Sequence, residues 1–180
     1  MTKIITLCGS NSKNSINRKL LEYAITCFKS SSVIHLEVSD YPMPIYCIDI
    51  ENETGFPENT HKLRNALSDA DGIVIVSPEH NGGMPAVLKN AIDWMSRVAD
   101  KDSPILFNKP TLLISTSPGV RGGSTNLKTM SALLPYWGAS SVDSYSLVSF
   151  YDNFSDGKLS SEENEKLVAV VESFEGKLIK

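Results

Sequence analysis

The sequence predicts an α/β fold in which an open, parallel, five-stranded sheet carries helices on both faces. Short runs rich in Ile, Val and Leu alternate with stretches whose apolar residues recur every three or four positions. Several of these runs are apolar almost throughout, as strands covered on both faces of a parallel sheet are. The connections are mostly short, which favours one sheet built from alternating strands and helices.

The predicted strands are, in chain order, 3–8 (KIITLC), 33–38 (VIHLEV), 72–77 (GIVIVS), 110–116 (PTLLIST) and 141–149 (SVDSYSLVS). The last run alternates between apolar and polar residues, which is typical of an edge strand. Five such strands suit the order 2-1-3-4-5. This is the flavodoxin-like arrangement, with helices on both faces of the sheet.

Helical spacing predicts helices at Ile16 to Phe28, Leu63 to Ala70, 86–99, Leu127 to Leu134 and Leu167 to Leu178. Ser160 and Glu163 have the spacing of a capping box before the last helix. The segment 40–59 contains prolines and acidic residues, so we expect it to be an irregular loop that is functional or forms an interface. We expect residues 1–180 to form a single domain.

Composition excludes several classes of function. The chain has 180 residues, of which 41% are hydrophobic, so it can bury a full core. A net charge of −4, with scattered lysines and arginines, argues against nucleic-acid binding. We find no apolar stretch long enough to cross a membrane and no pattern of a signal peptide, and we therefore expect a cytoplasmic protein.

The cysteines and histidines do not indicate a metal site. Cys8, Cys27 and Cys47 lack C-x-x-C or zinc-ligand spacing, and we interpret them as reduced, buried apolar residues. His35 and His61 lie in different contexts from His80, so no metal ligand set is expected.

Three loops follow the first, third and fourth predicted strands, where ligands bind in sheets of this kind. The first loop, 9–17 (GSNSKNSIN), precedes a helix whose free N–H groups and dipole favour an anion. These features predict a phosphate cradle, formed by Ser10, Ser12, Lys13, Ser15, Ile16 and Asn17. The plainer interpretation is a polar turn in which Ser15 is the N-cap.

The second loop, 77–84, reads SPEHNGGM. Pro78 ends the strand, and Gly82 and Gly83 allow the backbone to pass close to a flat ligand. An acid beside a histidine suggests proton transfer, but no serine or cysteine nucleophile is marked nearby. We therefore interpret the loop as a binding edge, formed by Pro78, Glu79, His80, Asn81 and Gly82, and we assign no catalytic residue.

The third loop, 115–125 (STSPGVRGGST), contains Ser117 and three glycines, Gly119, Gly122 and Gly123, where the backbone turns sharply or approaches a ligand closely. Arg121 is its one charged residue. A glycine-rich turn with an exposed arginine is the plainer interpretation.

Together the three loops resemble the NADPH-dependent FMN reductase family. Its first signature resembles G-S-x-R-x-x-S-x-N and is matched at Gly9, Ser10, Ser15 and Asn17. The second resembles P-E-Y-N-x-x-x-P-x-x-L-K-N-A-I-D-W and is matched at most positions of 78–94. The third, a serine followed by G-x-x-G-G, is matched at Ser117, Gly119, Gly122 and Gly123. The resemblance extends from about residue 3 to residue 135.

The resemblance implies an oxidoreductase that passes hydride from NADPH through bound FMN to a small acceptor such as a flavin, quinone, azo compound or metal oxyanion. It places the phosphate on the first loop and the flavin ring against 78–82 and 117–123. This sequence has Ser12 where the family has arginine and His80 where it has tyrosine, so we expect weaker FMN retention or an altered second-substrate face. Arg121 is a candidate for steering the phosphates of NADPH.

The resemblance also implies a homodimer or homotetramer. Helix 86–99 has an unusually wide apolar face, part of which we expect to meet another subunit. One alternative is a non-catalytic flavin module, either an electron carrier or a redox-sensing protein. The other is a scaffold or a binder of a different phosphorylated ligand, if the loss of the arginine abolished FMN binding.

Overall fold

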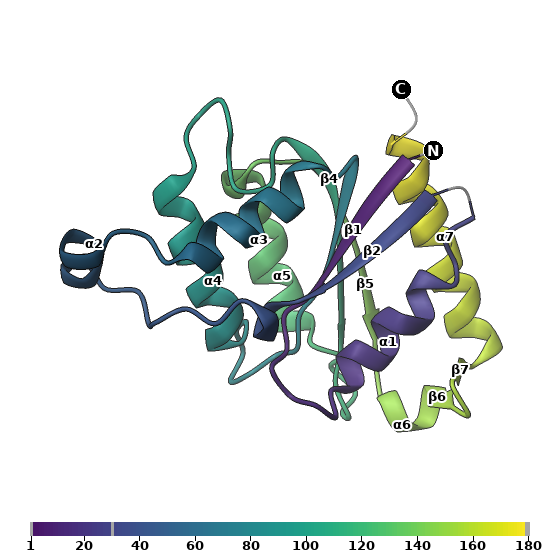
Figure 1. Ribbon diagram of the computed structural model, residues 1–180. Helices are drawn as coiled ribbons and strands as arrows, with labels where there is room; N and C mark the ends of the chain where they lie inside the picture. The colour runs from purple at the N-terminus through teal and green to yellow at the C-terminus, as the bar shows by residue number, and fades with distance from the viewer. Residues whose placement is uncertain (1, 30, 179–180) are drawn as a thin grey trace.

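The computed structural model, which describes residues 2–29 and 31–178, contains a parallel sheet of the predicted order, β2-β1-β3-β4-β5 (Figure 1). Its strands are β1 Thr2–Cys8, β2 Ser31–Glu37, β3 Gly72–Val76, β4 Lys109–Thr116 and β5 Ala139–Leu147. All four strand pairs are parallel. The predicted fold class and strands are therefore confirmed, and only the strand ends differ by one or two residues.

Helices cover both faces of the sheet, as predicted (Figure 1). The helices are α1 Ile16–Ile25, α2 Ile48–Thr54, α3 Glu58–Ser68, α4 Ala86–Val98, α5 Ser124–Leu133, α6 Phe150–Asn153 and α7 Ser161–Leu178. Two 3₁₀ turns, Val38–Asp40 and Leu134–Trp137, and a small hairpin of β6 Phe154–Ser155 and β7 Lys158–Leu159 complete the fold.

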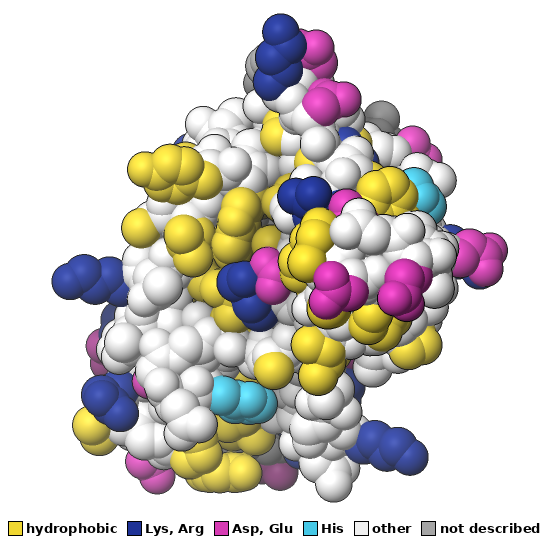
Figure 2. Space-filling view, turned by 90° about the vertical axis from the view of Figure 1, so that its left-hand side faces the viewer, with side chains coloured by type: hydrophobic (Ala, Val, Ile, Leu, Met, Phe, Trp, Pro, Cys, Tyr) yellow, Lys and Arg dark blue, Asp and Glu magenta, His cyan; other side chains and the backbone are white. Residues whose placement is uncertain are grey.

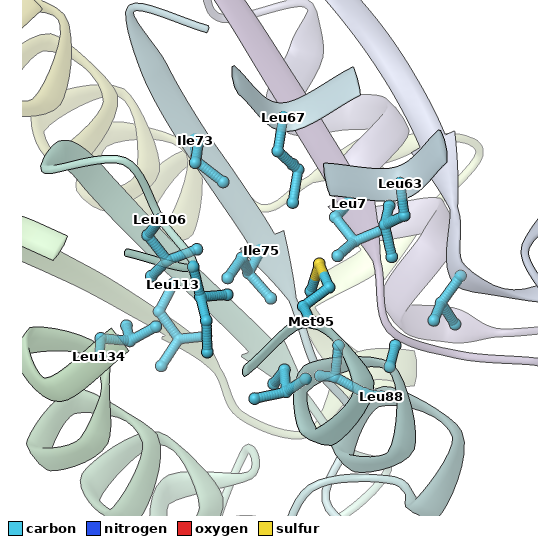
Figure 3. Close-up of a cluster of buried hydrophobic side chains, with 14 of the residues drawn as sticks. Leu7, Leu63, Leu67, Ile73, Ile75, Leu88, Met95, Leu106, Leu113 and Leu134 are labelled. Atoms are coloured by element: carbon cyan, nitrogen blue, oxygen red, sulfur yellow. The ribbon is translucent and has the colours of Figure 1, made fainter. Parts of the chain in front are cut away.

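The side chains of each strand alternate between two hydrophobic layers. One layer packs α3, α4 and α5 against β1, β3 and β4; Figure 3 shows leucine, isoleucine and methionine side chains meeting there. The other packs α1 and α7 against the opposite side of the same strands and of β5. Because both of its faces are buried, the central strand β3 carries no polar side chain.

The prediction of an irregular loop at 40–59 is wrong. Ile48–Thr54 forms α2, and α3 already begins at Glu58. The prolines at 42, 44 and 57 flank α2 instead of interrupting it. Asp49 and Glu51 lie in the first turn of α2, where the helix dipole favours negative charge.

We call residues 41–57 the arm, because this part of the chain projects away from the sheet beside α4 (Figure 1). Asn90 of α4 holds it through its side chain, donating to Pro44 O at 2.9 Å and accepting from Tyr46 N at 2.8 Å. Trp94 Nε1 also donates to Pro44 O, at 2.7 Å. The arm therefore covers Trp94, which is fully buried. The wide apolar face of α4 is explained by contacts within the chain, and the prediction that it meets another subunit loses this support.

The last helix begins where Ser160 predicts, but not through a capping box. The N–H of Ser160 donates to Asn153 O at 2.9 Å, so it does not bond to Glu163. The Glu163 carboxylate instead accepts a hydrogen bond from the Tyr145 hydroxyl at 2.8 Å. Across residues 2–29 and 31–178, no helix combines the length and the hydropathy that a bilayer crossing requires.

Candidate functional site

The three predicted loops lie together at the carboxyl ends of β1, β3 and β4, at the lower end of the sheet in Figure 1. In the first loop, each of three serine hydroxyls accepts a backbone N–H. Ser10 Oγ accepts from Ser12 at 3.2 Å, Ser12 Oγ from Asn14 at 3.3 Å, and Ser15 Oγ from Arg18 at 3.3 Å. Within the described chain none of these hydroxyls donates, so each keeps its hydrogen for an acceptor.

Ser15 is the N-cap of α1, as the plainer interpretation of the first loop states. This does not exclude an anion site, because the first-turn N–H groups of Ile16 and Asn17 have no partner within the helix. Lys13 is exposed, so its ammonium group is accessible to an anion.

Asn17 connects the first loop to the third. The residue is 2% exposed, and its side-chain amide donates to Thr116 O at 3.0 Å and accepts from Thr116 N at 2.9 Å. Since both ends of this amide are occupied, Asn17 can offer a ligand only its backbone N–H. The Asn17 side chain therefore holds the first loop against Thr116 and has no group left to contact a phosphate.

Arg18 is a residue of this site that the sequence did not reveal. Its guanidinium forms a bidentate pair with Glu37, at 2.6 Å from Oε1 and 2.8 Å from Oε2. It also donates to Ser12 O at 2.6 Å and Lys13 O at 3.1 Å. The hydrogen bond with Glu37 raises the pKa of Arg18 above its ordinary value. Burial acts to raise the pKa of Glu37, but the hydrogen bonds with Arg18 and His35 have a larger effect in the opposite direction. The pKa of Glu37 is therefore below its ordinary value.

The second loop contains a tight turn at Asn81 and Gly82, whose φ angles are 52° and 81°. His80 and Gly83 close this turn with two backbone hydrogen bonds, of 2.8 and 3.0 Å. Positive φ at both central residues is typical of a type I′ hairpin turn, for which Asn-Gly is the preferred sequence. The Asn-Gly pair therefore forms the turn itself, a role that the sequence analysis did not assign. His80 is exposed beside the turn.

Glu79 has a defined structural partner. Its Oε2 accepts the backbone N–H of Asn126, in the first turn of α5, at 3.0 Å. A carboxylate is favourable at this helix end, where N–H groups lack partners and the dipole is positive. The predicted role as a binding-edge residue is compatible with this contact, because Glu79 also lines the pocket described below.

Asn126 is a second residue that the sequence analysis missed. It is fully buried, and its Nδ2 donates to Ser77 Oγ at 2.8 Å and to Pro78 O at 3.1 Å. Its Oδ1 is buried without a partner among the described residues. Asn126 thus fixes the start of the second loop against α5. No local motif distinguishes it from an ordinary polar residue of a helix.

Two glycines of the third loop are required by the fold. Gly122 and Gly123 have φ angles of 57° and 81°. A Cβ on Gly122 would lie 2.9 Å from Leu147 O and closer still to Ser146 Oγ. Gly119 differs, since its φ is not positive and a Cβ there would meet nothing within 4 Å. Its lack of a side chain leaves open space beside Ser117, whose Oγ donates to Gly119 O at 3.1 Å.

The second and third loops together line an open pocket of about 550 Å³. It is lined by Glu79, Asn81, Gly82, Ser117, Gly119, Val120, Arg121 and Gly123. This volume lies within the range of small-molecule and cofactor sites. The structure therefore brings six of the nine residues predicted for these two loops around one cavity, whereas Pro78, His80 and Gly122 do not line it. Asn17 joins the first loop to the same edge of the sheet.

The cysteines differ in their environments. Cys8 is buried, as predicted, and burial raises the pKa of its thiol to about 12. Cys27 and Cys47 are only half-buried, which corrects the prediction for these two. In the part of the chain that the structure describes, no group of three or more His, Cys, Asp or Glu side chains is arranged to hold a metal ion.

Comparison with known proteins agrees with this geometry. A quinone reductase of Escherichia coli is 38% identical over 122 residues, which are 68% of this chain and 63% of that protein. A 2-hydroxy-1,4-benzoquinone reductase of a Burkholderia species is 36% identical over 120 residues, 67% of this chain and 63% of that protein. The matches thus span less than two thirds of the length of these relatives.

A flavoenzyme NAD(P)H:(acceptor) oxidoreductase of Paracoccus denitrificans has the same fold, with a TM-score of 0.77, 24% identity and coverage of 99% of this chain and 97% of that one. The family model described as NADPH-dependent FMN reductase matches residues 2–153, which include all three loops. The chain therefore belongs to the NADPH-dependent FMN reductase family.

Proposed function

We propose that this protein is an FMN-dependent oxidoreductase that takes hydride from NADPH and passes it to a small acceptor, with quinones as the first class to test. The observation that carries the proposal is the pocket between the second and third loops, beside a loop in which three serine hydroxyls donate to no acceptor among the described residues. Family membership and the quinone reductases among the relatives support it.

The residues of the edge fit FMN. A phosphate needs several donors, and the first loop offers the O–H groups of Ser10, Ser12 and Ser15 together with the N-terminus of α1. A flat ring system needs an open cavity, and the pocket offers one beside Gly119, where a side chain would project into free space. Lys13 supplies a positive charge, although as a point charge it does not clamp a phosphate as an arginine does.

The protein's own part in the reaction is binding and orientation. FMN, when bound, supplies the hydride chemistry between NADPH and the acceptor. The residues predicted for the ring are Pro78, Glu79, His80, Asn81 and Gly82 and, in the third loop, Ser117, Gly119, Gly122 and Gly123. Glu79 and Asn126 fix the second loop against α5, so the backbone groups of the edge are held before a ligand arrives. Hydride transfer to a flavin requires no side-chain acid, and we assign no catalytic residue.

A spectrum of the purified protein followed by a turnover assay tests this proposal. We expect flavin absorbance bands, or tight binding of added FMN, and NADPH oxidation that depends on a quinone, a flavin, an azo dye or a metal oxyanion. A flavin-loaded protein that oxidises neither NADPH nor NADH would instead support the electron-carrier or redox-sensing alternative. A protein that binds no FMN would support the scaffold alternative. Comparing NADPH with NADH in the same assay decides between the two nucleotides.

Arg121 is proposed to steer the nucleotide. It is exposed at the pocket, and its charge is available to the phosphates of NADPH. Arg121→Ala is expected to raise KM for NADPH with a smaller effect on kcat, since a rim cation contributes to encounter more than to chemistry. An unchanged KM for NADPH would remove this role.

We also propose that the protein self-associates through the arm. Figure 2 shows hydrophobic side chains gathered on the projecting arm and beside it. Ile45 is 84% exposed, and Ile48 and Phe56 are exposed as well. Exposed apolar groups of this size favour association. Sedimentation of the purified protein at micromolar concentration is expected to show a dimer or tetramer, and a monomer alone would contradict the proposal.

A further inference from the structure

Arg18 binds a carboxylate and the first loop at the same time. Its Nε and Nη2 atoms donate to the two oxygens of Glu37, at 2.6 and 2.8 Å, and Nη1 donates to Ser12 O and Lys13 O. These contacts occupy four of the five N–H donors of the guanidinium. The Arg18 guanidinium therefore bonds mainly within the protein, and only one of its N–H donors remains for a ligand.

Glu37 is itself held in place from β1 and β2. His35 Nε2 lies 2.7 Å from Glu37 Oε1, and His35 Nδ1 lies 2.9 Å from the hydroxyl of Thr6, which is fully buried in β1. The side chains of Arg18 and Glu37 are only 18% and 17% exposed. Partial burial and bidentate geometry distinguish this pair from an ordinary surface salt bridge.

The two carbonyl contacts determine which way the first loop faces. Because a peptide group is planar, its C=O and the following N–H point in opposite directions. When Arg18 draws the carbonyls of Ser12 and Lys13 toward itself, the N–H groups of Lys13 and Asn14 turn away from it. The N–H of Asn14 then reaches Ser12 Oγ at 3.3 Å, which leaves the Ser12 hydrogen for an acceptor. Without Arg18, these carbonyls are free to face the loop, where they would repel an anion.

We propose that Arg18 and Glu37 are positioning residues that hold the first loop in its anion-binding conformation and thereby set the affinity for the phosphate of FMN. The inference rests on the proposed function, in which that phosphate binds the first loop. Arg18 acts through Ser12 and Lys13 without touching the phosphate. The first loop has serine at position 12 and therefore lacks the charge of an arginine there. The loop conformation that Arg18 holds compensates for part of this loss.

The test measures the affinity of the flavin-free protein for FMN and for riboflavin, which has the same ring system without the phosphate, by flavin fluorescence. Arg18→Gln is expected to weaken FMN binding at least about tenfold. Arg18→Lys is expected to do nearly the same, because an ammonium group cannot bridge a carboxylate and two carbonyls in this geometry. Glu37→Gln is expected to weaken FMN binding about three- to tenfold. Riboflavin affinity is expected to stay within about twofold in all three variants.

Arg97→Lys is the matched control. Arg97 forms a similar pair with Glu51 on the arm, at 2.9 and 3.3 Å, and contacts no residue of the first loop in the described chain. Its FMN and riboflavin affinities are expected to equal those of the wild type. A thermal unfolding curve for each variant establishes that it is folded at the titration temperature.

Several results would overturn the inference. Tighter FMN binding by Glu37→Gln would mean that a released Arg18 contacts the phosphate directly. Wild-type affinity in Arg18→Lys would mean that only charge matters, and equal losses of FMN and riboflavin would indicate a general effect on the fold. If the wild type binds no FMN, the proposed function fails and the inference fails with it. If the wild type binds FMN and all variants match it, the inference alone fails.

Discussion

The loop edge of the sheet and the arm are both fixed by asparagine side chains, yet the two regions differ in what surrounds those side chains. At the edge, Asn17 and Asn126 are fully buried and bond to backbone groups of neighbouring loops. On the arm, Asn90 is half-buried and bonds to Pro44 and Tyr46. Water can replace a lost bond only where it has access, so the same interaction is costlier to remove at the edge. This difference suits an edge that orients a ligand and an arm that presents a surface.

Gly122→Ala is expected to produce the largest loss of stability. The new methyl group would overlap Ser146 Oγ and Leu147 O, and alanine is strained at a φ of 57°. We expect a loss of about 3 kcal/mol in the free energy of unfolding, measured by urea denaturation. Gly119→Ala is the control in the same loop, since it meets no atom within 4 Å and is expected to change stability little. Equal losses of stability for both variants would contradict the view that Gly122 has no room for a side chain.

Asn126→Ala is expected to cost about 2 kcal/mol in the free energy of unfolding, because it removes the bonds to Ser77 and Pro78 and leaves the buried Ser77 Oγ without a donor. Removal of its unpartnered Oδ1 offsets a part of this cost. Urea denaturation measures the effect, and FMN titration should show weaker binding because the second loop loses its anchor. A loss no larger than that of the corresponding arm variant would erase the proposed contrast between the two regions.

Asn90→Ala is that arm variant, and we expect a loss of about 1 kcal/mol, because Pro44 O keeps its bond from Trp94 Nε1 and solvent reaches the N–H of the half-buried Tyr46. Hydrogen exchange gives a sharper measurement than denaturation. The Tyr46 N–H is expected to exchange faster in the variant, while the N–H groups of 77–83 keep their wild-type rates. Faster exchange in both segments would show that the arm and the edge open together.

The smallest effect is expected in the pH dependence of the two arginine–glutamate pairs. The pKa of Glu37 is below its ordinary value of 4.5, so the carboxylate stabilises the native state above that pH and loses this effect as the pH falls through the native pKa. The stability difference between wild type and Glu37→Gln should therefore be greatest near neutral pH and shrink in acid. The pKa of Glu51 is also lowered, mainly by its bond with Arg97.

Glu51→Gln serves as the comparison for that titration. Its difference from wild type should shrink in the same direction but be smaller, because Arg97 is 43% exposed and solvent screens the pair. Urea denaturation over a series of pH values measures both variants. A stability difference for Glu37→Gln that grows in acid would contradict the lowered pKa.

The sheet could be predicted from the sequence because each strand carries its own signal. Continuous apolar runs such as GIVIV mark strands buried on both faces, and the positions of the three loops then follow from the fold. The helix of the arm is not predicted, because prolines at 42, 44 and 57 suggest an irregular segment, although they lie outside Ile48–Thr54. The turn at Asn81 and Gly82 does have a signal in the sequence, the Asn-Gly pair, which an interpretation of these glycines as flexible overlooks.

The partners of the site residues could not be predicted in the same way. Arg18 and Glu37 lie on different elements, and nothing in the residues around either one indicates the other. Asn17 resembles a ligand-binding residue in the sequence because it lies among serines. Its side chain instead forms two hydrogen bonds with the backbone of Thr116. Such pairings depend on the three-dimensional register of strands, and a local pattern does not encode them.

The link between Asn17 and Thr116 also bears on the order in which the chain folds. It joins residues 99 positions apart, and we expect it to close only after β3 and its flanking helices have reached the sheet. The ligand edge is thus expected to consolidate after the rate-limiting barrier. A cofactor bound there would slow unfolding and leave the folding rate nearly unchanged. Its effect on the protein would then be greater persistence of the native state once that state has formed, without faster folding.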